Sequence, residues 1–219
     1  MNAAGRETRL RITELFLSLQ GEAETAGFPT VFVRLTGCPL RCTYCDTTYA
    51  FTGGEWWSQG DVLARVAGFG VRHVCVTGGE PLAQRACLPL LAALCDAGHV
   101  VSLETSGALS IAAVDPRVQR VVDVKTPASG ESARNRCEDF ALLTPRDLLK
   151  FVIADRADYE WSLAQIGTHG LASRCTVLFS PVHGALAARD LAEWILADRA
   201  PVRFQIQLHK VLWGDVPGR

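Results

Sequence analysis

Three cysteines stand close together in the first quarter of the chain, with Cys38, Cys42 and Cys45 separated by three residues and then by two. An odd number of thiols cannot all pair as disulfides, so this spacing favours thiolate ligands gathered on one inorganic centre. A structural zinc site normally has four Cys or His ligands, and no second Cys-x-x-Cys or His-x-His pattern follows. A [4Fe-4S] cluster held by three thiolates would leave one iron free to bind a small molecule. We therefore predict an iron–sulfur cluster that serves as a reaction site.

Two other interpretations of the cysteines stay open at this point. Three buried structural cysteines would need no metal, and a zinc site could be completed by a distant histidine such as His73 or His209. Clustered thiols at short spacing in a reducing compartment more often bind a metal. The other five cysteines lie in mostly apolar stretches, where a free thiol behaves as a small hydrophobic group, and we assign them no ligand role.

Short apolar runs rich in β-branched residues alternate with segments of helical periodicity, which is the pattern of a parallel sheet covered by helices. An N-terminal strand runs into a glycine turn at 17–22, and further strands are predicted at 31–35, 73–76, 100–103, 121–124, 149–153, 176–179 and 204–207. Helices are predicted at 58–67, 82–97, 155–166 and 186–199. These units are fewer than the eight of a complete barrel, so we predict an α/β fold, a partial, open TIM-like barrel of parallel strands with outer helices.

The helix predicted at 82–97 has apolar residues at helical spacing along one side. Its buried stripe should consist of Cys87, Leu88, Leu91, Leu94 and Cys95. Gly98 should end it in a left-handed conformation.

Polar residues follow several of the predicted strands. In parallel α/β folds the ligand site forms at the carboxyl ends of the strands, so these loops should surround one mouth. Residues 77–81 (Thr-Gly-Gly-Glu-Pro) carry glycines that let the backbone approach a polar ligand. The following loops carry Glu104, the charges Asp123 and Lys125, and the pair Ser180–Pro181. Each also has a plain structural interpretation, since Gly and Pro end strands, hydroxyls cap turns, and opposite charges pair.

Composition limits the partners and the location. The chain has 219 residues, 48% of them hydrophobic and 21% charged, and its net charge of −1 gives no argument for nucleic acid or a membrane surface. No apolar run approaches the length of a membrane span, and the first residues lack the apolar segment of a signal peptide. We expect a cytoplasmic protein with a single domain over residues 1–219. Within it we expect a cluster loop at 37–47, a flexible loop at 126–136 and a flexible C-terminal tail at about 211–219.

The cysteine loop, with Tyr44 directly before its last cysteine, resembles the cluster loop of radical S-adenosylmethionine (SAM) enzymes. In that superfamily the free iron of a [4Fe-4S] cluster binds SAM, and an electron from the cluster cleaves SAM to methionine and a 5′-deoxyadenosyl radical. The resemblance implies that the three loop cysteines are the cluster ligands and that SAM carries the radical, so no side chain is assigned as catalytic. It also implies the following SAM contacts: Gly79, Glu80, Glu104, Asp123, Val124, Lys125, Ser180 and Pro181.

Further stretches narrow the resemblance to the 7-carboxy-7-deazaguanine synthase family. They are residues 17–22 (Leu-Ser-Leu-Gln-Gly-Glu), 32–38, 77–81, 104–107 and 209–210. That family converts 6-carboxy-5,6,7,8-tetrahydropterin to 7-carboxy-7-deazaguanine with release of ammonia, in queuosine and other deazapurine biosynthesis. The resemblance implies these substrate contacts: Leu19, Gln20, Gly21, Arg34, Thr77 and the C-terminal Arg219. It also implies Mg²⁺ bound by Thr47, an external one-electron reductant of the flavodoxin or ferredoxin type, and a homodimer.

Several assignments have competing explanations. Arg34 is a planar cation suited to a substrate carboxylate, but it could equally pair with a carboxylate inside the barrel. Without the resemblance, Asp46 and Thr47 would be interpreted as a helix cap and a turn residue. At the level of the whole protein, one rival is another radical SAM activity such as activation of a glycyl-radical enzyme. The other rival is a non-catalytic zinc-binding module.

Overall fold

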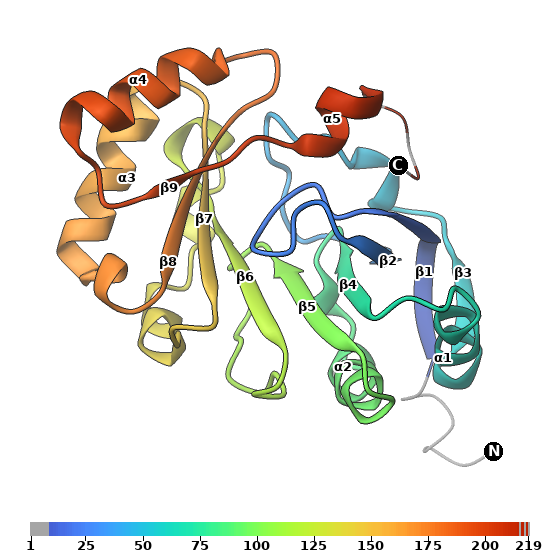
Figure 1. Cartoon of the computed structure of the whole chain (residues 1–219). Helices are drawn as coiled ribbons and strands as arrows, with labels where there is room; N and C mark the ends of the chain where they lie inside the picture. Colours follow the sequence, from blue (N-terminus) through green and yellow to red (C-terminus); the bar gives the residue numbers. More distant parts are fainter. Residues whose placement is uncertain (1–8, 215, 217, 219) are drawn as a thin grey trace.

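The computed structural model describes residues 9–214, 216 and 218. Nine strands form one sheet in the order β3-β1-β2-β4-β5-β6-β7-β8-β9, with β3 and β9 at opposite ends (Figure 1). The strands are β1 Arg9–Leu19, β2 Pro29–Leu35, β3 Glu55–Ser58, β4 His73–Gly78, β5 Val100–Thr105, β6 Gln119–Val124, β7 Leu148–Ile153, β8 Thr176–Pro181 and β9 Arg203–Phe204. The α-helices are α1 Gln59–Ala67, α2 Cys87–Asp96, α3 Arg156–His169, α4 Ala188–Asp198 and α5 Leu208–Trp213.

The pairing confirms the predicted open α/β barrel. Strands β2, β4, β5, β6, β7, β8 and β9 pair in parallel in that order. At one end of the sheet, β1 pairs antiparallel with both β2 and β3, a pairing that the sequence analysis did not predict. The connection from β1 to β2 covers only residues 20–28, which is short enough for antiparallel neighbours, whereas the parallel strands are joined by longer crossovers. Strand β3 reaches the other edge of β1 only after β2 and the cysteine loop.

Several element boundaries differ from the sequence predictions for identifiable reasons. Helix α2 begins at Cys87 because residues 81–83 form a separate 3-10 turn, whose Leu82 amide donates to the Glu80 carboxylate at 2.9 Å. Strand β1 begins eight residues before the predicted strand at 17–22, and β3 was not predicted. Strand β9 covers only two residues, and the chain beyond it forms α5 where a tail was expected.

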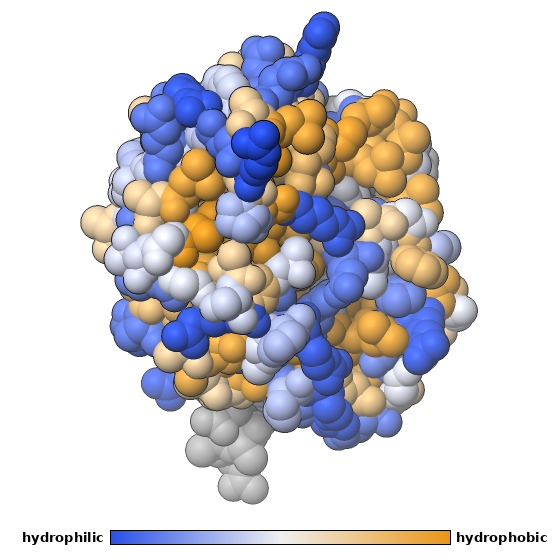
Figure 2. Space-filling view, turned by 60° about the vertical axis from the view of Figure 1, so that its left-hand side comes forward, coloured by the Kyte–Doolittle hydropathy of each residue, from blue (hydrophilic) through white to orange (hydrophobic). Residues whose placement is uncertain are grey.

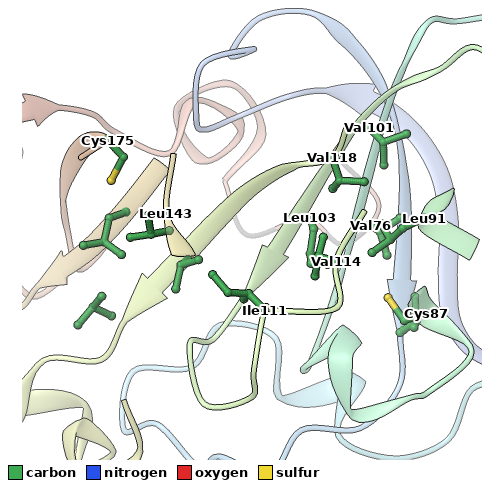
Figure 3. Close-up of a cluster of buried hydrophobic side chains, with 14 of the residues drawn as sticks. Val76, Cys87, Leu91, Val101, Leu103, Ile111, Val114, Val118, Leu143 and Cys175 are labelled. Atoms are coloured by element: carbon green, nitrogen blue, oxygen red, sulfur yellow. The ribbon is translucent and has the colours of Figure 1, made fainter. Parts of the chain in front are cut away.

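The side chains of the parallel strands alternate between two environments. One face packs against the helices, where Val76 of β4, Leu103 of β5, Leu91 of α2 and Val114 of the loop after β5 share one apolar core (Figure 3). In α2 the buried stripe contains Leu90, while the predicted Leu88 and Cys95 are only partly buried. The expected left-handed conformation of Gly98 is confirmed by its φ of +88°. The other face of the strands points into the barrel.

Apolar residues also reach the molecular surface. Figure 2 shows separate orange patches among hydrophilic residues on the face turned forward from the left-hand side of Figure 1. Leu196 of α4 is 72% exposed. Among the described residues, no helix is both long and apolar enough to cross a membrane.

A buried carboxylate ties together the amino ends of β6 and β7. Asp147 is 1% exposed and accepts hydrogen bonds from the backbone amide and the guanidinium of Arg120 and from the amide and hydroxyl of Thr144. Burial favours the neutral carboxyl, but these donors outweigh burial and lower the pKa of Asp147 below its ordinary value of 3.8.

Asp147→Asn should lower the free energy of unfolding at neutral pH by roughly 3 kcal/mol, because it leaves the half-buried Arg120 cation without its carboxylate. Because the pKa of Asp147 is lower in the folded state, the wild type should have its full extra free energy of unfolding above pH 3.8, the ordinary pKa of the group. This difference should be lost as the pH falls through the folded-state pKa. Urea unfolding of both proteins across acidic pH measures the difference. Asp96→Asn, at a side chain that is 68% exposed, is the control and should have little effect. A difference independent of pH would contradict the assignment.

Candidate active site

The inward face of the barrel surrounds a cavity of about 580 Å³. Because successive side chains of a strand point to opposite faces, the residues that line it come from alternate positions at the carboxyl ends of the strands. Arg34 of β2, Thr77 of β4, Glu104 of β5, Asp123 of β6 and Lys150 of β7 all lie on its wall. The size and the mixture of apolar and convergent polar groups suit a small-molecule site.

The three predicted cluster ligands line this same cavity. Cys38, Cys42 and Cys45 are free thiols and are partly exposed. Burial raises the pKa of the Cys38 and Cys42 thiols. No group of three His, Cys, Asp or Glu side chains within 9–214 is arranged around a point where a single metal ion could bind. Cysteine thiolates are the usual ligands of a [4Fe-4S] cluster, and three thiols on one cavity wall supply donors of that kind.

The stretch 126–136, expected to be a flexible loop, supports the cysteine loop. The Thr43 amide donates to the Ser129 carbonyl at 3.0 Å, and the Thr43 hydroxyl donates to the Ala128 carbonyl at 2.7 Å. The Arg41 amide donates to the Glu131 carboxylate at 2.6 Å. The two segments therefore hold each other in place.

The Gly-Gly-Glu segment after β4 packs directly beneath the cysteine loop. A Cβ atom on Gly79 would lie 2.4 Å from the Gly37 carbonyl oxygen and 2.8 Å from the Cys38 Cβ, so only glycine fits. The Glu80 amide donates to the same Gly37 carbonyl at 2.7 Å. Its fully buried carboxylate accepts from the Thr105 hydroxyl at 2.9 Å and the Ser106 amide at 2.7 Å. Gly79 lies on the cavity wall, whereas Glu80 lies behind it and joins three loops.

The predicted substrate residues converge on one side of the cavity. Arg34 forms an ion pair with Glu14 through Nε at 2.6 Å, so the salt bridge proposed as an alternative role for Arg34 is present. Arg34 also lies on the cavity wall. Burial opposes its charge, but Tyr49 and Glu14 outweigh burial and raise the pKa of Arg34. Thr77 donates its hydroxyl to Glu104 at 3.0 Å.

The N-terminal loop and the C-terminal helix meet at the mouth. Leu19 and Gln20 line the cavity, whereas Gly21 packs against the C-terminal helix, where an added Cβ would lie 2.1 Å from the His209 Nδ1. The Leu208 amide donates to the Gly21 carbonyl at 3.0 Å. Arg219 lies outside the described residues. Figure 1 shows α5 at the same end of the molecule as the light-blue loop region that follows β2.

The strand ends assigned to SAM differ in how they meet the cavity. Asp123 and Lys125 form an ion pair at 3.0 Å on the wall. The second oxygen of Asp123, Oδ1, is buried and has no hydrogen-bond partner among the described residues. Val124 points into the apolar core, which follows from its alternate position on β6. Ser180 and Pro181 are buried and do not line the cavity; Val182 and His183, the next two residues, do.

Thr47 also lies on the wall, at the end of the cysteine loop. Its hydroxyl donates to Asp46 Oδ1 at 2.9 Å, which fixes the hydrogen and leaves the oxygen lone pairs for another partner. Burial raises the pKa of Asp46, but the Lys210 ammonium at 2.9 Å outweighs burial and lowers it. A hydroxyl oxygen beside an ionised carboxylate suits a hard divalent cation.

Sequence reasoning missed several residues of the wall. Glu22, Lys150 and Gln207 line the cavity, and the sequence analysis gave none of them a role. Lys150 could have been recognised from the sequence, because it is the one charged residue inside the apolar strand 149–153, and a charge in such a strand is costly to bury unless it is paired or used. Gln207 could not have been recognised, because it was predicted to lie in a strand.

Comparison with known proteins places this site in a family. Residues 32–123, which include the cysteine loop, the Gly-Gly-Glu segment, Glu104 and Asp123, match the family model described as "Radical SAM superfamily". The 7-carboxy-7-deazaguanine synthase of Chlorobaculum tepidum is 47% identical over 210 residues, covering 94% of this chain and 96% of that protein. This chain belongs to the 7-carboxy-7-deazaguanine synthase family. The resemblance predicted from the motifs is thereby confirmed.

Other relatives of the 7-carboxy-7-deazaguanine synthase family agree. The synthase of Koribacter versatilis is 42% identical over 219 residues, covering 93% of this chain and 97% of that protein. The crystal structure of QueE from Escherichia coli has a TM-score of 0.73 at 27% identity and covers 92% of this chain and 95% of that one. Membership in this radical SAM family implies a [4Fe-4S] cluster and SAM as cofactors, and the three cavity cysteines fit that requirement.

Gly79→Ala should reduce the iron and sulfide bound per chain after anaerobic reconstitution, because its Cβ would displace the backbone of the cysteine loop. Overpacking of this kind also destabilises a fold by about 1–3 kcal/mol. Gly167→Ala is the matched control, since a Cβ there meets no atom within 4 Å and lies in α3. Full iron loading of the Gly79 variant would show that the loop tolerates the displacement.

Proposed function

We propose that this protein is a radical SAM enzyme that converts 6-carboxy-5,6,7,8-tetrahydropterin to 7-carboxy-7-deazaguanine with release of ammonia, in queuosine or another deazapurine pathway. The observation that carries the proposal is that one cavity contains both the three cluster cysteines and Arg34. Nearly full-length identity to named synthases supports the same conclusion. The cofactor side and the substrate side of the reaction therefore share a wall.

Two sets of residues bind the two cofactors. Cys38, Cys42 and Cys45 hold the cluster, and the strand ends at Gly79, Glu104 and 123–125 hold SAM. Together these cofactors supply the one-electron chemistry that removes a hydrogen atom from the substrate. Asp123 Oδ1, which lacks a partner in the described structure, is available to accept a hydrogen bond from a ligand. Glu80, Val124, Ser180 and Pro181 shape this side from behind the wall.

The substrate is held by groups across the cavity. Arg34 binds the pterin carboxylate through its terminal nitrogens, because its bond to Glu14 uses Nε. Leu19, Gln20 and Thr77 contact the pterin, with Gln20 and Thr77 both oriented by Glu104. Gly21, which resemblance assigned to the substrate, instead holds the C-terminal helix at the mouth of the cavity. Arg219 at the chain end is assigned to the substrate by family resemblance alone. Closure of the site protects a reactive radical from water.

The remaining assignments extend beyond the site. An external one-electron carrier of the flavodoxin or ferredoxin type would reduce the cluster. The family resemblance implies a homodimer, and the composition of the chain favours a location in the cytoplasm. The single nine-stranded sheet supports one domain over the chain.

Turnover of the pterin by anaerobically reconstituted protein tests the proposal. With SAM, Mg²⁺ and a chemical reductant, but no partner protein, we expect 7-carboxy-7-deazaguanine and ammonia. An enzyme that activates a glycyl-radical partner would give no product under these conditions. A colourless protein with one zinc and no sulfide would establish the zinc-module alternative instead.

Arg34→Ala should leave iron and sulfide content unchanged while reducing turnover by at least about a hundredfold, because a charged anchor of the substrate is lost. Glu14 would then keep its hydrogen bond from Tyr49 but lose its cation, so the double variant Arg34→Ala/Glu14→Gln separates loss of binding from loss of stability. Arg189→Ala, at a side chain that is 88% exposed, is the control. Retained activity in both Arg34 variants would show that the carboxylate is held elsewhere.

Thr47→Val should raise the Mg²⁺ concentration needed for half-maximal activity several-fold, since the side chain keeps its shape but loses the ligand oxygen. Thr47→Ser keeps the hydroxyl and should behave like the wild type. Thr48→Val changes the exposed neighbouring residue as the control. Titration of activity with Mg²⁺ distinguishes the variants, and identical curves would remove Thr47 from the metal site.

A further inference from the structure

Lys150 is a buried cation to which the proposed reaction assigns no role. It lies on the inward face of β7, with Leu149 and Phe151 on either side of it in the outer core. Its side chain is 12% exposed and lines the cavity. Its Nζ lies 2.6 Å from Glu22 and 3.7 Å from Asp123. It therefore stands between two carboxylates from different elements.

Glu22 connects this lysine to the C-terminal segment. Its carboxylate accepts from the Gln207 amide at 2.9 Å and from the Gln205 amide at 3.3 Å. The oxygen of the Gln205 side chain in turn accepts from the Ala23 amide at 2.8 Å. Glu22 is only 8% exposed, so its charge needs a compensating cation, and Lys150 is that cation.

Asp123 connects the same lysine to the opposite side of the cavity. Its Oδ2 is shared between Lys125 at 3.0 Å and Lys150 at 3.7 Å, which orients the unpartnered Oδ1. Burial disfavours the Lys150 ammonium, but Glu22 and Asp123 outweigh burial and raise the pKa of Lys150 above its ordinary value. The Lys150 side chain is therefore charged at neutral pH.

We propose that Lys150 is a positioning residue that sets the distance between the Glu22 side and the Asp123 side of the cavity. This inference rests on the proposed function, because it concerns how the substrate is placed against the cofactor. Radical transfer needs the reacting atoms in near contact, and a misplacement of about 1 Å can cost about a hundredfold in rate. Without Lys150, SAM would still be cleaved, but a smaller fraction of the cleavage events would lead to product.

The experiment compares Lys150→Met with the double variant Lys150→Met/Glu22→Gln, which leaves no uncompensated glutamate, and with Lys150→Arg, which keeps the charge. Arg189→Met on the surface of α4 is the matched control. For each protein we would measure iron and sulfide content, Tm, the KM for the pterin, and 5′-deoxyadenosine released per product formed.

We expect the double variant to fold and bind iron like the wild type. Its KM for the pterin and its ratio of 5′-deoxyadenosine to product should each rise about tenfold, the size typical of lost coupling between neighbouring groups. Lys150→Arg should restore most of both values. An unchanged KM and an unchanged ratio of 5′-deoxyadenosine to product in a folded double variant would overturn the proposal. Failure of both Lys150→Met and Lys150→Met/Glu22→Gln to fold would overturn it as well. If the wild type itself forms no product, the proposed function fails instead.

Discussion

Most charged side chains on the cavity wall are largely buried, and this constraint organises the site. An isolated buried charge is costly, whereas a paired one can be tolerated. The structure meets the constraint with ion pairs: Arg34 with Glu14, Lys125 with Asp123, Lys150 with Glu22, and Lys210 with Asp46. All of these pairs except the local Lys125–Asp123 pair join separate parts of the chain, so the arrangement that neutralises the wall also fixes the relative positions of the strands and loops around it.

The cluster loop is positioned by a different kind of contact. Its support comes mainly from backbone groups, with the Gly37 carbonyl receiving the Glu80 amide and the Ser129 carbonyl receiving the Thr43 amide. The Glu80 carboxylate extends this support by binding the loop after β5. Backbone contacts leave the cysteine side chains free for ligand binding, while the protein on either side of the loop stays fixed. The same carboxylate thus supports the cysteine loop without lining the cavity.

Sequence reasoning identified what local patterns determine. Apolar runs such as 149–153 and 176–179 predicted parallel strands because burial on both faces leaves a clear compositional signal. The cysteine spacing predicted the centre because ligand chemistry restricts it strongly. Properties that depend on register were not accessible. Val124 and Asp123 are neighbours in sequence, but only the pleat decides that one enters the core and the other enters the cavity. Likewise, Glu80 sits inside a matching motif, yet its partners come from the next strand.

The least predictable part is the junction of the two ends of the chain, and it is also the part that completes the cavity. An open barrel leaves its first and last strands without a shared edge, so other groups must cover the gap. Here Gln205 reaches Ala23 and Glu22, and Leu208 reaches Gly21, across more than 180 residues of sequence. No local periodicity encodes such contacts, and long-range contacts are costly in loop-closure entropy. The mouth of the cavity therefore depends on a few polar bonds rather than on a large apolar surface, which makes Glu22 and its lysine partner disproportionately important to its shape.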